Sequence, residues 1–282
     1  MANSDSVAGI ANLIIGCGYL GRPVADLWLR QGKRVAALTR NRADELRGLG
    51  IEPVLGDVLA APTLPRADTV LYAVGLDRTA GRSFREVYVD GLSHVLDHLP
   101  LPRRFIYVSS TSVYGQTDGS WVDESSPTEP SEENGKIVLE AEQLLRSRLP
   151  GAILLRFAGI YGPDRMIRRA SIEKGEMLTG DFDKVINLIH VEDGARAVLA
   201  AEERGQPGQT YLIADGNPAT RRDFYTFMAE LLGAPPVRFG DADAATSLRD
   251  RSNRRISNRK MLAAFGDLLR YPDYRSGLVA SL

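Results

Sequence analysis

Short apolar runs alternate, over residues 1–160, with stretches in which apolar residues recur every three to four positions. A short apolar run favours a buried strand, whereas the longer period favours an amphipathic helix. The predicted strands cover residues 11–15, 33–39, 51–55, 69–74, 104–108 and 152–156. The predicted helices cover residues 23–31, 42–49, 84–99 and 132–149. Strands that alternate with helices indicate parallel pairing through right-handed crossovers, so we expect an α/β fold with a doubly wound parallel sheet.

The pattern becomes less regular after Tyr161-Gly162-Pro163. It then predicts a strand and a helix within residues 185–202, a strand over 210–213, and helices over 222–232 and 259–265. Glycines follow the last two helices, as is common at a helix C-terminus. We therefore expect a large domain over residues 1–160, to which residues 185–213 return. A smaller C-terminal lobe is expected to contain residues 161–184 and 214–282.

Composition narrows the class of protein. The chain has 282 residues, 44% of them hydrophobic, and a formal net charge of −1, so it has no general attraction for nucleic acid. No apolar run approaches the roughly 18 residues of a membrane-spanning helix. The first ten residues lack the basic and apolar segments of a secretory signal, and the single cysteine cannot form an internal disulfide. We expect a soluble cytoplasmic protein that binds a small molecule and holds no metal, because its three histidines are scattered.

A glycine-rich turn joins the first predicted strand to the first predicted helix. It reads Gly16-Cys17-Gly18-Tyr19-Leu20-Gly21. Glycines at such a turn let the backbone bend sharply and let a pyrophosphate approach the amide groups at the helix N-terminus. The position therefore predicts dinucleotide binding, and the alternative is a tight turn without a ligand. The residues expected at the dinucleotide are Gly16, Gly18, Tyr19, Leu20 and Gly21.

The end of the second predicted strand bears on the choice of nicotinamide cofactor. An acidic residue there binds the ribose 2′-hydroxyl of NAD, whereas a basic residue accommodates the 2′-phosphate of NADP. The chain has Arg40-Asn41-Arg42 and no carboxylate at this point. We therefore expect NADP, with NAD as the alternative, and we place Arg40 and Asn41 at the phosphate. The arginines could otherwise be solvated charges at the start of a helix.

Later strand ends supply the other expected cofactor contacts. Asp57 and Val58 follow the third strand and are expected near the adenine. Residues 73–75 end the fourth strand and Ser109 ends the fifth, and both are expected beside the cofactor. For the third and fourth strand ends the alternative is an ordinary strand exit. The residues expected here are Asp57, Val58, Ala73, Val74, Gly75 and Ser109.

Five motifs in a fixed order resemble the extended short-chain dehydrogenases/reductases, and within them the atypical NAD-dependent epimerase/dehydratase group. The resemblance covers nearly the whole chain. It implies a Rossmann domain for the cofactor, a C-terminal lobe for the substrate, often a sugar nucleotide, and oxidoreductase or epimerase activity. The motifs lie at Gly16–Gly21, Gly56–Val58, Val108–Gly115, Leu155–Pro163 and Ile189–Asp193.

The resemblance also implies a catalytic Ser or Thr after the fifth strand and a Tyr-x-x-x-Lys pair on the next long helix. The phenol exchanges a proton with the substrate oxygen, while the lysine ammonium lowers the phenol pKa and binds the nicotinamide ribose. Thr111 matches the first position. Asn134 and Val138 match the tyrosine and the lysine, and neither side chain titrates. Residues 122–160 contain no tyrosine, and Lys136 lies roughly 200° round the helix from Val138.

Three explanations of the missing pair are open. Tyr114 or Tyr88 supplies a phenol from another element; or Thr111, Ser110 or the substrate itself handles the proton; or the chain is a non-catalytic NADP-binding redox sensor or regulatory protein. Conversion of a carbonyl substrate would separate the third from the other two. The catalytic candidates are Thr111, Tyr114 and Ser110.

Two arginine clusters suit an anionic ligand, because guanidinium groups bind phosphates through paired hydrogen bonds. The resemblance places both regions at the substrate, so we expect Arg165, Arg168 and Arg255 to bind a phosphorylated or nucleotide-linked substrate. A solvated basic face balanced by aspartates is the alternative. A structural role is favoured for His190. Residues 84–99 and 132–149 are candidates for a homodimer interface. The clusters are Arg165, Arg168 and Arg169, and Arg249, Arg251, Arg254, Arg255 and Arg259.

Overall fold

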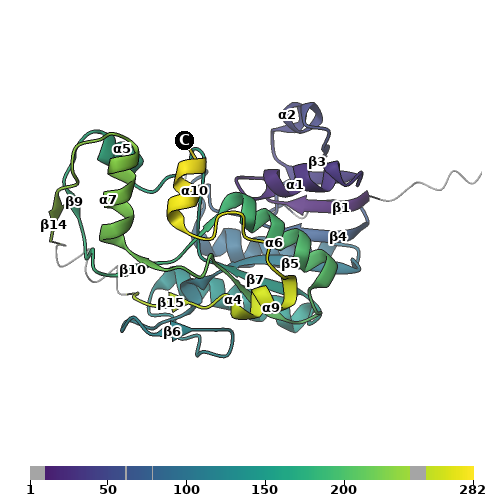
Figure 1. The fold of residues 1–282 in the computed structure, drawn as a ribbon. Coiled ribbons are helices and arrows are strands. Elements are labelled where there is room, and N and C mark those ends of the chain that lie inside the picture. The colour runs from purple at the N-terminus through teal and green to yellow at the C-terminus, as the bar shows by residue number, and fades with distance from the viewer. Residues whose placement is uncertain (1–9, 61, 78, 242–251) are drawn as a thin grey trace, which may run out of the picture. The chain divides into compact units, whose positions relative to one another are not determined.

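Seven strands form a sheet in the hydrogen-bonded order β12-β7-β5-β4-β1-β2-β3 (Figure 1). The structure is a computed structural model that describes residues 10–60, 62–77, 79–241 and 252–282, so the segment examined for a secretory signal lies almost wholly outside it. The strands are β1 (Ile10–Ile15), β2 (Val35–Thr39), β3 (Glu52–Leu55), β4 (Ala67–Tyr72), β5 (Arg104–Ser110), β7 (Ile153–Phe157) and β12 (Thr210–Ile213). From β1 the order runs outwards through the parallel β2 and β3 on one side and the parallel β4 and β5 on the other. The predicted doubly wound sheet is confirmed.

The helices that connect these strands follow the predicted pattern, with one exception. They are α1 (Gly21–Arg30), α2 (Ala43–Gly48), α3 (Gly91–His98), α4 (Glu133–Arg148) and α6 (Val191–Arg204). The predicted single helix over residues 84–99 is wrong in its first half, because Glu86–Asp90 forms a π-helical turn before α3 begins. At the junction the Gly91 backbone packs so closely on Val58 that an added Cβ would lie 2.9 Å from Cγ2 of Val58.

The chain divides into two compact units, of which the first comprises residues 1–108, 140–154 and 198–209. Its core contains a buried carboxylate, that of Glu202 near the end of α6. Trp28 Nε1 donates to it over 2.6 Å, Asn12 Nδ2 over 3.1 Å and Lys33 Nζ over 2.8 Å. Because three donors satisfy the buried charge, it fastens β1 and α1 to α6.

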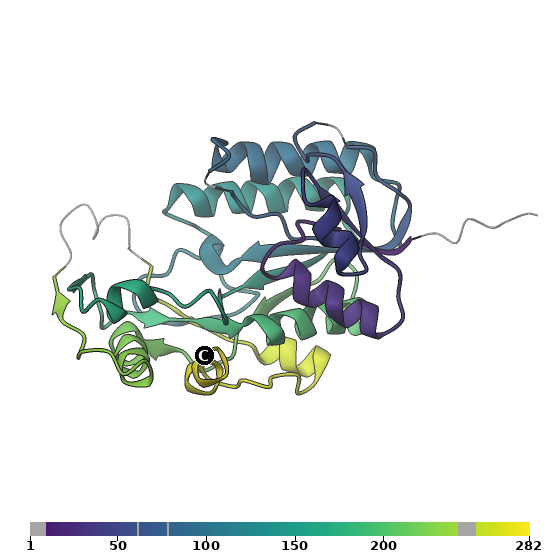
Figure 2. The same ribbon diagram turned by 90° about the horizontal axis from the view of Figure 1, so that it is seen from above.

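Two helical segments of the first unit run side by side, as Figure 2 shows. Arg148 near the end of α4 pairs with Asp97 of α3 at 2.6 Å, and Arg85 pairs with Glu140 of α4 at 2.6 Å. Exposed pairs of this kind contribute at most about 1 kcal/mol each. They align the two helices, whose stability comes from their buried faces.

The second unit comprises residues 109–139, 155–197 and 210–282 and contains several short strand pairs. These are β6 (Trp121–Val122) with β15 (Arg255–Ile256), β8 (Gly159–Tyr161) with β11 (Leu188–His190), β9 (Leu178–Thr179) with β14 (Phe239–Gly240), and β10 (Val185–Ile186) with β13 (Ala219–Thr220). Among its described residues, the helices placed wholly in this unit are α5 (Arg169–Glu173), α7 (Arg221–Leu231), α9 (Arg259–Phe265) and α10 (Tyr274–Ala280). Most of these strands were not predicted, because two or three residues are too few to show a period.

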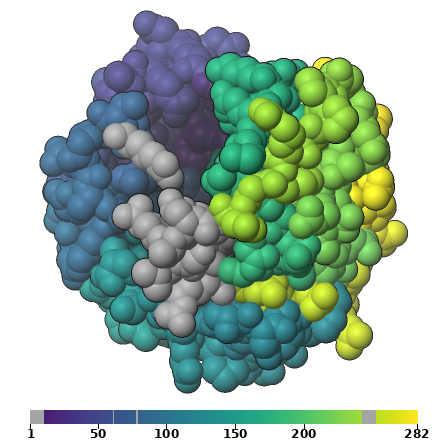
Figure 3. All heavy atoms as spheres, turned by 90° about the vertical axis from the view of Figure 1, so that its left-hand side faces the viewer, coloured from purple at the N-terminus to yellow at the C-terminus, as the bar shows by residue number. Residues whose placement is uncertain are grey.

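An apolar core links α7 and α10 with residues 161–188 within the second unit. Its fully buried members are Tyr161, Phe224, Met228 and Leu278. In Figure 3 the segment around residue 170, in teal-green, and the segment around residue 220, in light green, adjoin on the face that is shown. Thr220 caps α7 by accepting the Asp223 amide N–H at 3.0 Å.

Within the part of the chain that the structure describes, no helix has the length and the apolar content needed to cross a bilayer.

Candidate cofactor and catalytic sites

The predicted glycine turn lies between β1 and α1 in the first unit. Gly16 has a φ of 99°, and a Cβ at this position would lie 2.4 Å from the carbonyl carbon of Ala73. Only glycine fits such a backbone without strain. At Gly18 the position of a Cβ is open, with no heavy atom of the described residues within 4 Å. The turn is therefore closed towards the end of β4 and open at Gly18, which fits the approach of a pyrophosphate.

In the structure the strand end at residues 73–74 lies against the glycine turn. The Ala73 amide N–H donates to the Ile15 carbonyl over 2.7 Å, and the backbone of Ala73 and Val74 contacts Gly16. Asp57 is half-buried, and its Oδ1 accepts the Leu59 amide N–H at 3.0 Å. That bond shapes the turn after β3 and leaves Oδ2 for a ligand.

Arg42 contacts the glycine turn directly. Its Nη2 donates to the Cys17 carbonyl over 2.8 Å, which places a positive charge against the loop. Burial raises the pKa of the Cys17 thiol, so this side chain stays neutral and fills space. Tyr19 is half-buried and Leu20 is buried.

Arg40 lies on the surface after β2, with Asn41 exposed beside it. Arg40 Nη2 donates to Asp77 Oδ2 over 2.9 Å. Hydrogen bonds from Thr79, together with Arg40, lower the pKa of the Asp77 carboxyl. A 2′-phosphate would compete with this carboxylate for Arg40. Asp77 was not predicted beside Arg40, because it lies 37 residues further along the chain.

The second unit contains the predicted catalytic turn, which follows β5. A single 3₁₀ turn covers Thr111–Val113, and Ser110 caps it by accepting the Ser112 amide N–H at 3.1 Å. Thr111 is mostly buried, as is Ser109. The Thr111 carbonyl accepts two hydrogen bonds, one from the Tyr114 amide at 3.2 Å and one from Arg254 Nη2 at 2.8 Å. This turn is thus held by a residue of the distant C-terminal segment.

Tyr114 ends the turn and pairs with a buried arginine. Its phenol oxygen accepts a hydrogen bond from Arg156 Nη1 at 2.8 Å. Tyr114 is 1% exposed and Arg156 is 5% exposed. Arg156 was not among the predicted site residues. An arginine inside the apolar strand β7 was the signal that could have identified it.

The other phenol considered from sequence, Tyr88, belongs to the first unit. It lies in the π-helical turn, where its half-buried ring stacks on Phe84 with the centroids 4.1 Å apart. Of the two tyrosines, only Tyr114 directly follows the Thr111 turn.

The start of α4 shows what occupies the positions assigned to the tyrosine and the lysine. Asn134 is exposed, and Val138 is buried. Lys136 is 58% exposed and lies 3.7 Å from Glu133, which confirms that it points away from the face of Val138. Between them, a Cβ on Gly135 would lie 2.5 Å from the Ser112 carbonyl oxygen. The first turn of α4 therefore packs backbone to backbone on the Thr111 turn.

The arginines predicted to bind substrate lie in two places in the second unit. Arg165 and Arg168 are exposed on the loop before α5. Arg255 Nη1 donates to the Gly119 carbonyl, and its amide N–H donates to Ser120 at 2.8 Å, so Arg255 fastens β15 to the segment around β6. Arg254, its neighbour, is the cluster member that contacts the Thr111 turn. Arg249 and Arg251 lie outside the described residues.

His190 is buried, with both ring nitrogens in contact with partners. Its Nε2 lies 3.3 Å from Ser281 Oγ, and its Nδ1 lies 3.3 Å from the Glu192 amide nitrogen. Burial lowers its pKa. These contacts agree with the structural role favoured from sequence.

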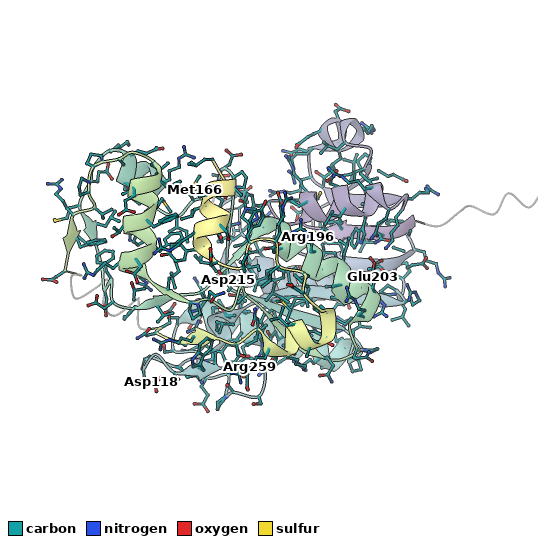
Figure 4. All side chains as sticks on the ribbon, in the orientation of Figure 1. Asp118, Met166, Arg196, Glu203, Asp215 and Arg259 are labelled. Carbon is teal, nitrogen blue, oxygen red and sulfur yellow. The ribbon has the colours of Figure 1, made fainter. Side chains whose placement is uncertain are left out.

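Two buried aspartates of the second unit differ in how they are satisfied. Asp193 accepts hydrogen bonds from the Arg270 and Tyr271 amides at 2.9 and 2.8 Å and from Arg196 at 2.6 Å. Asp215, near α10 in Figure 4, accepts only the Asn217 amide at 2.9 Å through Oδ1, and its Oδ2 has no partner among the described residues. Burial raises the pKa of Asp215 to about 8.

Comparisons with known proteins connect these features to a family. Residues 12–214 match the model of the NAD dependent epimerase/dehydratase family. The chain is 31% identical over 277 residues to Protein YeeZ of Escherichia coli strain K12, covering 92% of this chain and 96% of that protein. It is 30% identical over 248 residues to a 4-hydroxy-2-methyl-3-oxo-4-farnesyl-3,4-dihydroquinoline-1-oxide ketoreductase of Stigmatella aurantiaca, covering 77% of this chain and 72% of that one. A conserved protein of unknown function from Silicibacter pomeroyi has a solved structure that superposes with a TM-score of 0.79 at 30% identity, covering 96% and 97% of the two chains.

Proposed function

The chain belongs to the NAD-dependent epimerase/dehydratase family, and from that premise we propose that it is an NADP-linked oxidoreductase acting on a carbonyl group of a small molecule. The cofactor supplies the hydride donor or acceptor when it is bound at the glycine turn. The absence of a carboxylate after β2 and the positions of Arg40 and Arg42 support NADP, and NAD is the alternative. A relative named as a ketoreductase supports a ketone as the reacting group.

The observation that carries the proposal is the pairing of a phenol with a guanidinium directly after Thr111. Arg156 Nη1 lies 2.8 Å from the phenol oxygen of Tyr114. A buried cation stabilises negative charge on that oxygen as its proton leaves, which is what the lysine does for the tyrosine in the usual arrangement. In the proposed reaction the hydroxyl of Thr111 holds the carbonyl oxygen with Ser110 beside it, and Tyr114 exchanges the proton.

The proposal is tested with Thr111→Val and Tyr114→Phe in a screen of ketones and aldehydes with NADPH. Each substitution should lower kcat by about 10²- to 10³-fold, the usual share of a positioned proton donor. Affinity for NADPH should stay within about twofold, because neither residue belongs to the glycine turn.

Tyr161→Phe is the matched control, since Tyr161 is another buried tyrosine of the second unit and lies outside the Thr111 turn. It should keep its activity if folded. Full activity in Tyr114→Phe would show that the phenol does not transfer the proton, and the transfer would then fall to Thr111 or Ser110.

One observation favours a second function. Tyr114 is 1% exposed and Asn134 does not titrate, so in this conformation the phenol is covered. A non-catalytic NADP-binding sensor or regulatory protein needs only the glycine turn. NADPH binding without oxidation of NADPH by any carbonyl compound in the screen would select this function over the first.

The substrate class and the assembly are further parts of the proposal. Arg165, Arg168 and Arg255 are proposed contacts for a phosphorylated or nucleotide-linked substrate. A homodimer through residues 84–99 and 132–149 and a cytoplasmic location stay predictions. Sedimentation equilibrium of the wild-type chain and of a variant with charges reversed on the exposed face of α4 would test the dimer.

A further inference from the structure

Of the buried polar atoms of the second unit that have no hydrogen-bond partner among the described residues, two lie in adjoining segments. They are Nη1 of Arg254 and Oε1 of Gln116. The backbones of the two segments are joined, because the Asn253 amide N–H donates to the Gln116 carbonyl at 3.1 Å. Leaving a buried donor of a charged group unsatisfied costs more free energy than a typical hydrogen bond returns. A donor and an acceptor are thus both unsatisfied in adjoining segments.

The position of Arg254 is fixed from several directions. Its Nη2 donates to the Thr111 carbonyl at 2.8 Å. The side chain of Asn187 forms hydrogen bonds with the backbone on both sides of Arg255. Its Nδ2 donates to the Arg254 carbonyl at 2.8 Å, and its Oδ1 accepts the Ile256 amide N–H at 2.8 Å. The guanidinium is therefore oriented before any ligand arrives, which lowers the entropy cost of binding.

The charge of Arg254 is not balanced by an ion pair within the part of the chain that the structure describes. Burial lowers the pKa of its guanidinium, and Glu132 and Tyr114 oppose this effect from a distance. Arg196, another partly buried arginine of the same unit, lies 2.6 Å from a carboxylate oxygen of Asp193. Arg254 therefore differs from Arg196 in that its nearest polar contact is a backbone carbonyl.

We propose that Arg254 is a substrate-binding residue whose Nη1 takes an anionic oxygen, that of a carboxylate or a phosphate group on the substrate. The position next to Thr111 rests on the proposed function, in which Thr111 holds the carbonyl oxygen. One guanidinium then contacts both the catalytic turn and the anionic group, so the two groups of the substrate lie close together. The substrate class is a carbonyl compound with an acidic group near the carbonyl, such as an oxo acid or a phosphorylated ketone.

The test is an anion titration of the wild-type chain without cofactor. Sodium malonate and sodium phosphate are compared with sodium chloride at equal ionic strength, and the fluorescence of Trp121 is followed. Trp121 is suitable because it is exposed on β6, which pairs with β15 at the residue after Arg254. Saturable binding of malonate or phosphate beyond the effect of chloride is expected, and the tighter of the two identifies the anionic group as carboxylate or phosphate.

Arg254→Gln should weaken that binding by at least about tenfold, the typical effect of losing a hydrogen bond to a charged group. Arg259→Gln is the matched control, because Arg259 is exposed on α9 in the same arginine cluster, and it should bind as the wild-type chain does. Equal affinity of Arg254→Gln and the wild-type chain, or no binding beyond chloride in the wild-type chain, would overturn the proposal.

Arg254→Lys covers the case in which Arg254→Gln fails to fold, as judged by near-UV circular dichroism. Lysine keeps the charge and loses the planar pair of donors, so binding should weaken by about three- to tenfold. Wild-type affinity in a folded Arg254→Lys chain would also contradict the proposal. Since the titration needs no cofactor and no turnover, its failure leaves hydride transfer untouched, and loss of the Tyr114 proposal leaves the titration valid.

Discussion

The glycine turn of the first unit and the Thr111 turn of the second unit depend on different kinds of interaction. The first is defined by backbone, since Gly16 adopts a φ of 99° against the Ala73 carbonyl. The second depends on side chains from far along the sequence, with Arg156 42 residues from Tyr114 and Arg254 143 residues from Thr111. A local motif therefore suffices to predict cofactor binding, whereas the chemistry depends on contacts that no local motif contains.

The largest effect is expected from Gly16→Ala. The new Cβ would lie 2.4 Å from the Ala73 backbone in a conformation that alanine avoids. Neither the backbone of β4 nor that of the turn can move aside cheaply, so the free energy of unfolding should fall by more than about 3 kcal/mol. Urea denaturation measures the loss.

Gly18→Ala is the matched control for that variant. Its Cβ meets no described atom, so stability should change by less than about 1 kcal/mol. Affinity for NADPH should nevertheless fall at least about tenfold, because the side chain occupies the approach of the pyrophosphate. A Gly18→Ala chain that binds NADPH as tightly as the wild type would mean that the cofactor is bound elsewhere.

Val138→Lys would restore the lysine of the usual Tyr-x-x-x-Lys pair at the start of α4. Val138 is 3% exposed, so Val138→Lys would bury an ammonium where an apolar side chain now packs. We expect a loss of about 2–4 kcal/mol in the free energy of unfolding, measured by urea denaturation.

Asn134→Tyr is the control, since the position is exposed and should tolerate the ring within about 0.5 kcal/mol. A Val138→Lys chain as stable as the wild type would show that this turn of α4 still accommodates the pair.

Glu202 of the first unit and Asp215 of the second unit are buried carboxylates that differ in how they are satisfied. Glu202 has three donors, whereas Oδ2 of Asp215 has no partner in the part of the chain that is described, and burial raises the pKa of Asp215 to about 8. Because the folded state holds this proton more tightly than the unfolded chain, with its reference pKa near ~3.9, stability from this group is present below about pH 4. It is lost as the pH rises towards about 8.

Asp215→Asn should therefore leave stability nearly unchanged near pH 4 and raise it increasingly as the pH rises, by roughly 3–6 kcal/mol at pH 8.5 relative to the wild-type chain. The side-chain oxygen of the new asparagine can still accept the hydrogen bond from the Asn217 amide N–H. Thermal denaturation of both chains at the two pH values measures the difference. A constant difference across this range would show that Asp215 does not titrate there.

The smallest effect concerns the choice between NADP and NAD. Arg40→Ser should weaken NADPH binding by about tenfold and leave NADH binding within about twofold, since only NADPH has the 2′-phosphate. Asp77→Asn removes the carboxylate that competes for Arg40, so it should strengthen NADPH binding by about two- to fivefold. If the ratio of NADPH affinity to NADH affinity is the same in the wild-type chain, Arg40→Ser and Asp77→Asn, the 2′ position of the ribose does not lie at Arg40.

The sequence predicted the elements whose residues show a clear period. The strand at 210–213 and the helix at 259–265 have the bounds that their apolar spacing indicated. The two-residue strands are too short for a period, and the π-helical turn reads as ordinary helix because its apolar spacing is similar.

For the site, the glycine turn was predictable because it is a local backbone requirement. Asp77 beside Arg40, Arg156 beside Tyr114 and Arg254 beside Thr111 could not be predicted from sequence, because each pairing forms only when distant segments fold together. Of these, Arg254 had a signal in the arginine cluster, but the spacing did not separate it from Arg255.

The most direct test of the central claim is a titration of the wild-type chain with NADPH and with NADH, followed by the fluorescence of the reduced nicotinamide. We expect saturable binding of both nucleotides, tighter for NADPH, and a loss of at least about tenfold in affinity for NADPH in Gly18→Ala. Negligible binding of both nucleotides would contradict the cofactor site, and tighter binding of NADH would contradict the preference for NADP.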